Sequence, residues 1–404
     1  MTQDSKPLVI LALPKHDDAF TSTPYQLAKE LAKDRDVWYV SHPYTWIDFL
    51  TNIRKNKSWK RFWASWPFSL RQETTEQERL RILYLPLTLP INAFPPGMLY
   101  KVLSSLNHYW VASTLRRLIR QELFNDYVFV NSHDFYLGRI HHWLPRPSLY
   151  IYHCIDPIIK AYSARHGHYL EKKAASEADI VVATSPFLKK KMQQYHAQSY
   201  TVPNAANFEL SHRATLPETE PHAAILKIAG PRVGYIGNIE RRINYDWLTD
   251  IFTRRTDWQL VMVGPRNDQY IPDKFKQLSN VHFVSSVPHT QLPNVLKAFD
   301  VALIPFAKDE VSAQIYPLKL FEYMGSGKPV VTTDFNREVT APFQDDIFVG
   351  TTIEELEIAI ENALSETGEE GAQRRISIAS QNDWAARGQQ LSEIINEHTY
   401  VKAY

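Results

Sequence analysis

The segment that says most about this chain reads Tyr316-Pro317-Leu318-Lys319-Leu320-Phe321-Glu322-Tyr323-Met324-Gly325-Ser326-Gly327-Lys328-Pro329-Val330-Val331. It predicts a helix from Leu318 to Met324, a glycine turn, and a buried strand that starts at Val330. Pro317 suits the first helical position, where no amide hydrogen is missed. A helix that leads into a buried strand is typical of α/β proteins with a parallel sheet.

The start of this predicted helix carries the groups that bind phosphate. The free amides of Leu318 and Lys319, the helix dipole and the Lys319 ammonium together favour a diphosphate. Glu322 lies on the same helix face, and phosphate would repel it, so it suits neutral hydroxyls such as those of a ribose. The alternative is an exposed Lys319–Glu322 pair, which would contribute only about 0.2 to 0.5 kcal/mol.

Short apolar runs alternate with helical patterns along the whole chain. In the first half we expect strands at 8–13, 36–40, 81–85, 127–131, 149–153 and 180–183, and in the second half at 233–236, 260–263, 281–284, 301–304 and 330–332. The polar segment 204–231 between the two series is interpreted as an interdomain connection. We therefore predict two doubly wound α/β domains that face each other across a cleft, with ligands beyond the carboxyl ends of the strands.

The composition excludes several classes of protein. Lys and Arg total 45 against 44 Asp and Glu, so nothing commits the chain to nucleic acid. Cys154 is the single cysteine, so no disulfide can form within the chain and a reducing compartment is expected. No apolar run approaches the roughly 18 residues of a membrane span. We expect a cytoplasmic protein, at most peripheral to the inner face of a membrane.

The segment from Arg54 to Arg71 is the most biased part of the sequence. It has six basic residues, no acidic ones and five large aromatic side chains: Trp59, Phe62, Trp63, Trp66 and Phe68. This combination suits an anionic membrane interface, where each basic residue contributes about 1 kcal/mol. Two alternatives remain, namely that the aromatics pack in the core or that the segment binds a nucleic-acid strand. No other basic surface supports the nucleic acid.

The segment 322–331 resembles the donor-site signature of GT-B glycosyltransferases of the large bacterial glycan-building families, in which two glutamates are separated by seven residues. Glu322 matches the second glutamate, and the first falls on Gln314, which carries no charge. The run Pro317 to Tyr323 resembles the branch that includes teichuronic-type enzymes and the xanthan glucuronosyltransferase.

The resemblance implies a GT-B fold of two Rossmann-like domains. The acceptor-binding domain would span residues 1–205 and the nucleotide-sugar-binding domain residues 206–382. Residues 383–404 would form a helix that crosses back to the first domain.

The resemblance also implies donor-binding residues outside the predicted helix. Gly237 ends a strand, and Arg241 and Arg242 follow it in the loop where the family has a basic pair that contacts the diphosphate. Guanidinium groups match phosphate oxygens in geometry and charge. A solvated basic loop is the alternative. The backbone near Val287 resembles the segment that reads the base.

Two residues of the first half are predicted to be catalytic. His133 follows a strand and resembles the family's histidine, which could hydrogen-bond the donor sugar or carry a proton. Asp156 matches the general base of the inverting xanthan-type enzyme, and burial beside an apolar strand would raise its pKa as a base requires. The alternatives are a structural histidine and an aspartate that caps a helix.

By this resemblance the chain transfers a sugar from a nucleotide diphosphate sugar, expected to be a UDP-sugar, to a glycan or polyprenyl-linked acceptor in cell-surface polysaccharide synthesis. No metal and no other cofactor is expected, because Lys319 and an arginine supply the positive charge. Two alternatives are a non-catalytic subunit that binds nucleotide sugars, which Gln314 makes conceivable, and a sugar-nucleotide epimerase.

Overall fold

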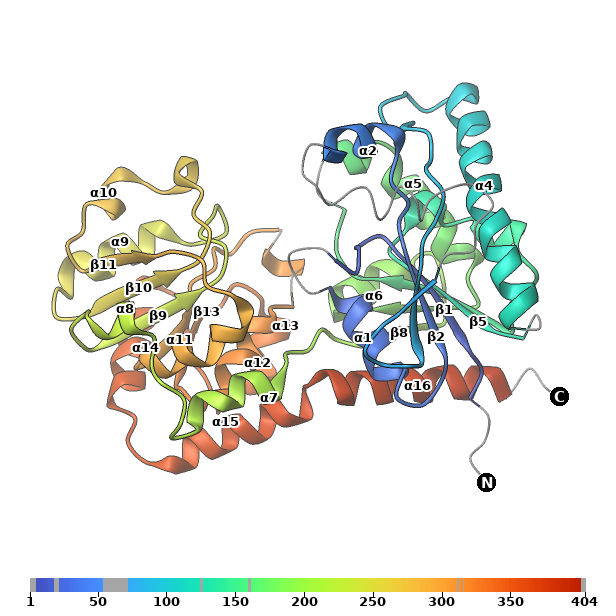
Figure 1. The fold of residues 1–404 in the computed structure, drawn as a ribbon. Coiled ribbons are helices and arrows are strands. Elements are labelled where there is room, and N and C mark those ends of the chain that lie inside the picture. The colour runs from blue at the N-terminus through green and yellow to red at the C-terminus, as the bar shows by residue number, and fades with distance from the viewer. Residues whose placement is uncertain are drawn as a thin grey trace. The chain divides into compact units, whose positions relative to one another are not determined.

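The computed structural model describes residues 5–17, 22–53, 72–123, 126–158, 161–310, 312–314 and 316–400. The chain forms two compact units (Figure 1). Unit 1 is Met1–Pro203 with Arg387–Tyr404, and unit 2 is Asn204–Ala386. The basic and aromatic segment from Arg54 to Arg71 lies outside the described residues.

Unit 1 is built on an eight-stranded sheet with the order β3-β4-β2-β1-β5-β6-β7-β8. The strands are β1 (Leu8–Ala12), β2 (Val37–Ser41), β3 (Gln72–Thr74), β4 (Leu80–Leu83), β5 (Val128–Ser132), β6 (Leu149–Cys154), β7 (Ile180–Ala183) and β8 (Ser199–Thr201). All neighbours pair in parallel except β3, which is antiparallel to β4. Parallel strands are buried on both faces, which explains the uninterrupted apolar runs in the sequence.

Helices cover the sheet of unit 1. They are α1 (Thr23–Leu31), α2 (Trp46–Ile53), α4 (Met98–Glu122), α5 (Ala161–Glu177), α6 (Pro186–Gln193) and α16 (Trp384–Tyr400). Val111 and Leu115 of α4 join one core cluster with Val9 and Phe129 of the central strands. Burial of such side chains contributes about 1.5 to 3 kcal/mol each.

Unit 2 contains a six-stranded parallel sheet with the order β11-β10-β9-β12-β13-β14. The strands are β9 (Arg232–Ile236), β10 (Gln259–Val263), β11 (Val281–Val284), β12 (Val301–Ile304), β13 (Val330–Thr333) and β14 (Phe348–Gly350). The helices are α7 (Phe208–His212), α8 (Ala223–Leu226), α9 (Tyr245–Arg254), α10 (Asp273–Lys276), α11 (Leu292–Ala298), α12 (Leu318–Gly325), α13 (Arg337–Thr340), α14 (Ile353–Ser365) and α15 (Glu369–Gln381). The predicted α/β class with two doubly wound parallel sheets is confirmed.

The prediction that 204–231 is only a connection is wrong. The segment folds into α7 and α8 and belongs to unit 2. Ser211 of α7 is buried so close to α12 that a Cβ on Gly325 would lie 2.3 Å from its hydroxyl oxygen. Ile225 of α8 is fully buried in the core of unit 2. A few apolar side chains therefore anchor a segment whose average polarity suggested a loop.

The last helix, α16, is long and continuous. From Arg387 onward it belongs to unit 1. There the Gln390 side-chain amide donates to the Thr201 carbonyl at 3.0 Å, and His398 pairs with the Tyr200 hydroxyl at 2.8 Å. Among the described helices of the chain, not one combines the length and apolar character that crossing a bilayer demands.

Candidate functional site

A glycine at the carboxyl end of β9 lies against the side chain of Lys319. Gly237 has a φ of +145°, and a Cβ added to it would lie 2.4 Å from Lys319 Cε and 2.7 Å from Nζ. Gly264, at the end of β10, has a φ of +141°, and its Cβ would lie 2.1 Å from the Gly237 carbonyl oxygen. Only glycine fits both positions, so the strand ends leave room for the Lys319 ammonium.

Helix α12 begins at Leu318, so Pro317 occupies the cap and not the first helical position that we predicted. The amides of Leu318 and Lys319 are consequently in the first turn, where no intrahelical acceptor exists. The Tyr323 hydroxyl accepts a hydrogen bond from the Ile236 amide at 2.9 Å and ties the helix to β9. This bond keeps the first turn of α12 beside Gly237.

The ammonium of Lys319 lies in a partly buried cationic site. Burial lowers the pKa of Lys319, Arg242 lowers it further, and Glu322 and Glu240 raise it. Arg242 is paired with Glu240 at 2.6 Å, and Lys319 Nζ lies 5.6 Å from the centre of the Tyr235 ring. Phosphate binds readily where two cations are close and partly desolvated, because the attraction is less screened there.

Glu322 is partly buried on the same helix. Burial raises its pKa, while Lys319 and His289 lower it. Since Lys319 and Glu322 are both partly buried, the alternative of an exposed surface pair is wrong. His289 lies in a short helical turn at His289–Gln291. No sequence pattern indicated that it belongs to the site, because its proximity to Glu322 depends on the path of the loop after β11.

The structure brings Gly237, Lys319 and Arg242 together, whereas Arg241 is an exposed side chain outside these contacts. Val287 is partly buried and lines a hollow of about 670 Å³ along the edge strand β11. Gln314 ends the short helix Ser312–Gln314, and its side chain is not among those described. Leu318, at the start of α12, is partly buried.

A second group of polar residues follows β5 in unit 1. His133 has a φ of 60°, which is rare for a residue other than glycine. Two hydrogen bonds between Asn131 and Asp134 close the turn around it: the Asp134 amide donates to Asn131 Oδ1 at 2.9 Å, and Asn131 Nδ2 donates to the Asp134 carbonyl at 3.1 Å. Burial lowers the pKa of His133, which Glu171 and Asp156 partly raise again.

The expectation that Asp156 is buried is wrong. Asp156 is exposed, two residues after β6 ends at Cys154. The predicted burial of Asp156 is therefore absent. Its charge nevertheless acts on His133, so the two predicted catalytic residues are electrostatic neighbours.

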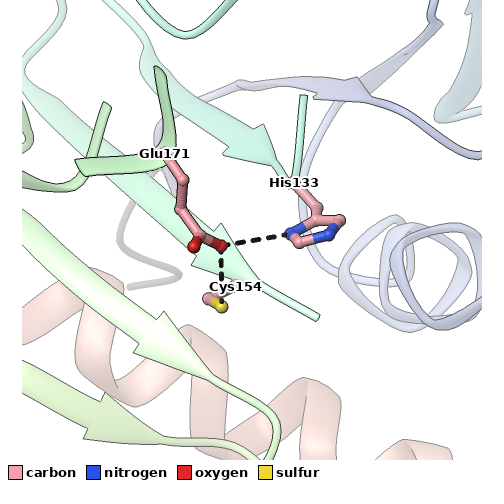
Figure 2. A group of neighbouring side chains, drawn as sticks. All are labelled: His133, Cys154 and Glu171. Carbon is pink, nitrogen blue, oxygen red and sulfur yellow. Dashed lines mark hydrogen bonds and ion pairs between the residues drawn. The ribbon is translucent and has the colours of Figure 1, made fainter. Parts of the chain in front are cut away.

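Beside His133 lies the buried carboxylate of Glu171, which no sequence pattern singled out (Figure 2). His133 Nδ1, Cys154 Sγ and Glu171 Oε1 lie within 4.8 Å of one another, a spacing open to a metal ion. The Glu171 carboxylate already has two partners: Lys191 pairs with Oε2 at 2.7 Å, and the Cys154 thiol donates to Oε1 at 3.6 Å.

The two sheets and the site at the end of β9 define a GT-B architecture of two Rossmann-like units. Three solved structures share this fold over nearly their whole length. The trehalose-phosphate synthase of Burkholderia vietnamiensis has a TM-score of 0.70 at 9% identity and covers 100% of this chain and 99% of its own. Sucrose-phosphate synthase from Thermosynechococcus elongatus has a TM-score of 0.62 at 15% identity, and the match covers 97% of this chain and 98% of that chain. Anabaena HepE, solved with UDP, has a TM-score of 0.64 at 14% identity, and the match covers 97% of this chain and 100% of that chain.

Sequence comparison identifies the family. Residues 230–366 match the model described as glycosyl transferases group 1, and residues 68–210 match that of glycosyltransferase family 4. The proposed teichuronic acid biosynthesis glycosyltransferase TuaH of Bacillus subtilis (strain 168) is 25% identical over 224 residues, and the match covers 53% of this chain and 56% of TuaH. The chain belongs to the group 1 glycosyltransferases with the GT-B fold.

Proposed function

We propose that this chain transfers a sugar from a nucleoside diphosphate sugar to a hydroxyl of an acceptor. The observation that carries the proposal is the Lys319 ammonium held over Gly237 at the first turn of α12. Partly buried, it can take one phosphate, and the helix amides take the other. Arg242 adds a second cation. UDP is the nucleotide to try first, because HepE, which has the same fold, was solved with UDP.

In this reaction the acceptor oxygen attacks the anomeric carbon of the donor sugar. The bond from that carbon to the diphosphate oxygen breaks, its electrons stay on the diphosphate, and the acceptor hydroxyl loses its proton to a base. Lys319, Arg242 and the first-turn amides stabilise the charge that develops on the diphosphate. Glu322, with its pKa raised by burial, accepts hydrogen bonds from the ribose hydroxyls.

Unit 1 supplies the base and a sugar contact in this proposal. Asp156 takes the acceptor proton, which requires that its carboxylate come within hydrogen-bond reach of the hydroxyl. His133 hydrogen-bonds the donor sugar. The exposed position of Asp156 allows the substitution Asp156→Asn without a packing cost. Transfer should fall by about 100-fold or more, with UDP affinity unchanged. Unchanged transfer would eliminate Asp156 as the base.

The decisive experiment incubates the purified chain with a panel of nucleotide sugars, with and without bacterial membrane lipid extract, and measures free nucleoside diphosphate. We expect release that depends on the extract. Binding of the nucleotide sugar without release would favour the non-catalytic subunit, and interconversion of the sugar without an acceptor would favour the epimerase.

We further propose that the acceptor is carried by a lipid and that one end of unit 1 contacts an anionic membrane. In Figure 1, α2 and the N-terminal end of α4 lie at the same end of this unit. Large apolar side chains are exposed on both helices, including Leu50 at 63% and Met98 at 78%. Of the described basic residues of α4, Lys101 lies at this end, whereas Arg116, Arg117 and Arg120 lie toward the other end of the helix. The basic segment from Arg54 to Arg71 follows α2 directly in the sequence. Apolar side chains flanked by positive charge are typical of interfacial helices.

Sedimentation with lipid vesicles tests the membrane contact. We expect the chain to bind vesicles that contain phosphatidylglycerol and not vesicles of phosphatidylcholine alone. The double variant Leu50→Glu/Met98→Glu should lose this binding. Ile358→Glu is the matched control, because Ile358 is also an exposed apolar residue, 55% accessible, but belongs to unit 2. Equal loss in the control, or binding retained by the double variant, would refute the surface.

A further inference from the structure

A charged side chain is buried behind His133. Glu171, on α5, is 1% exposed, and its Oε1 lies 4.0 Å from His133 Nδ1. The ammonium of Lys191, on α6, and the thiol of Cys154, on β6, hold the same carboxylate. Figure 2 shows one ring nitrogen of His133 turned toward Glu171 and the other turned away.

Packing does not account for this carboxylate. A buried ion pair loses several kcal/mol of hydration per ion, and an apolar side chain of similar size is often at least as stable in its place. Apolar residues at both positions 171 and 191 would therefore pack α5 and α6 at least as well. Two neighbours of this charge have unmet hydrogen-bonding groups: His133 Nδ1 and the Tyr152 hydroxyl are both buried and lack a partner within the described part of the chain.

The backbone already fixes where His133 stands. The turn between Asn131 and Asp134 holds its φ at 60°, and its ring packs edge-on against Phe135 with centroids 5.4 Å apart. What remains open is which ring nitrogen carries the proton. A carboxylate near Nδ1 favours the proton on that nitrogen, and a distance of 4.0 Å can shorten to a hydrogen bond when a ligand closes the site.

We propose that Glu171 is a positioning residue, which keeps the imidazole proton of His133 on Nδ1 so that Nε2 offers its lone pair to a hydroxyl of the donor sugar. This inference rests on the proposed function for the identity of the hydroxyl. The placement of the proton is a property of the free protein and can be tested without any substrate. Lys191 has a supporting part, since its ammonium pairs with the Glu171 carboxylate at 2.7 Å in the core.

Histidine NMR on the full chain tests the placement of the proton. Nitrogen shifts of wild-type His133 should show the Nδ1–H form. The pKa of His133 should fall in Glu171→Gln and rise in Lys191→Met, because the two substitutions remove opposite charges. The charged and titratable groups that face His133 are Glu171, Asp156, Lys191, Asp134 and His153. The opposite shifts show that both charges act on His133, and the Nδ1–H fraction separates the positioning role from a purely structural one.

Several results would overturn the inference: a wild-type Nε2–H form, shifts of the same sign in both variants, or about one zinc ion per purified chain. If a single variant fails to fold, Glu171→Gln/Lys191→Met removes both charges together and should lower the Nδ1–H fraction; an unchanged fraction counts against Glu171.

The second measurement is kcat/KM against pH, from UDP release. The acid limb of this profile should shift to lower pH in Glu171→Gln and to higher pH in Lys191→Met. At neutral pH, kcat/KM should fall about tenfold in Glu171→Gln, with UDP affinity retained. Unmoved limbs in active variants would refute a role in the reaction. A wild-type chain that releases no UDP would defeat the proposed function, while the NMR result would still decide where the proton lies.

Discussion

Replacing Lys319 by methionine should separate nucleotide binding from folding. Methionine keeps most of the length of the side chain and removes the charge. Burial lowers the pKa of Lys319, so the folded chain holds this ammonium at a cost. Lys319→Met should therefore leave the free energy of unfolding unchanged or raise it at neutral pH. Most substitutions of partly buried residues do the opposite.

The same substitution should weaken UDP binding strongly. A hydrogen bond to a charged group contributes about 1.5 to 3 kcal/mol, which corresponds to roughly a 10- to 150-fold loss of affinity. At a UDP concentration of about 100 times the wild-type Kd, binding stabilises the folded wild type by about 2.7 kcal/mol. A variant with 100-fold weaker binding would gain only about 0.4 kcal/mol.

Isothermal titration with UDP and urea unfolding measure the two effects. Lys328→Met is the matched control, because burial also lowers the pKa of Lys328, which lies by Asp300 and Arg232 at the opposite end of the sheet from Gly237. UDP affinity should be unchanged in this control. The reasoning fails if Lys319→Met binds UDP within twofold of wild type, or if Lys328→Met loses as much.

The pH dependence of Lys319 has a definite sign. The pKa of Lys319 in the folded chain lies below its ordinary value of 10.5, so the unfolded chain binds more protons between the two values. This group therefore makes the folded state more stable as pH rises through that window and less stable as pH falls. Lys319→Met should lack this contribution.

Two further predictions concern the glycine contact and a buried histidine. Gly237→Ala should cost about 1 to 3 kcal/mol of stability, because the φ of Gly237 lies in the left-handed region. The new Cβ should also displace Lys319 and weaken UDP binding, which calorimetry on the folded variant would measure. Normal UDP affinity would contradict the contact between Gly237 and Lys319. Burial lowers the pKa of His153 to about 3, so only the unfolded state takes up a proton here as pH falls below about 6.5. The free energy of unfolding should therefore fall by about 1.4 kcal/mol per pH unit from this group. Urea unfolding at pH 7 and pH 5 should show that dependence reduced in His153→Gln, and an equal dependence in both proteins would contradict it.

The fold class and the family could be predicted from the sequence because their signals are local. A buried parallel strand needs a continuous apolar run, as in Val301–Ile304. The start of α12 at Leu318 is marked in the sequence by Pro317, which directly precedes it. The error over 204–231 has a local cause too, since the few apolar side chains that anchor this segment, such as Ile225, give little apolar signal among polar neighbours.

The composition of the candidate sites depended on tertiary structure. Arg241 and Arg242 are adjacent in sequence, but only the turn after β9 decides that Arg242 faces Lys319. Glu171 lies 38 residues beyond His133, and no pattern in α5 distinguishes it from a surface acid. Local periodicity determines which segments form strands and helices. The partners of a charged side chain depend on which strand ends lie side by side, and this arrangement exists only once the sheet has assembled.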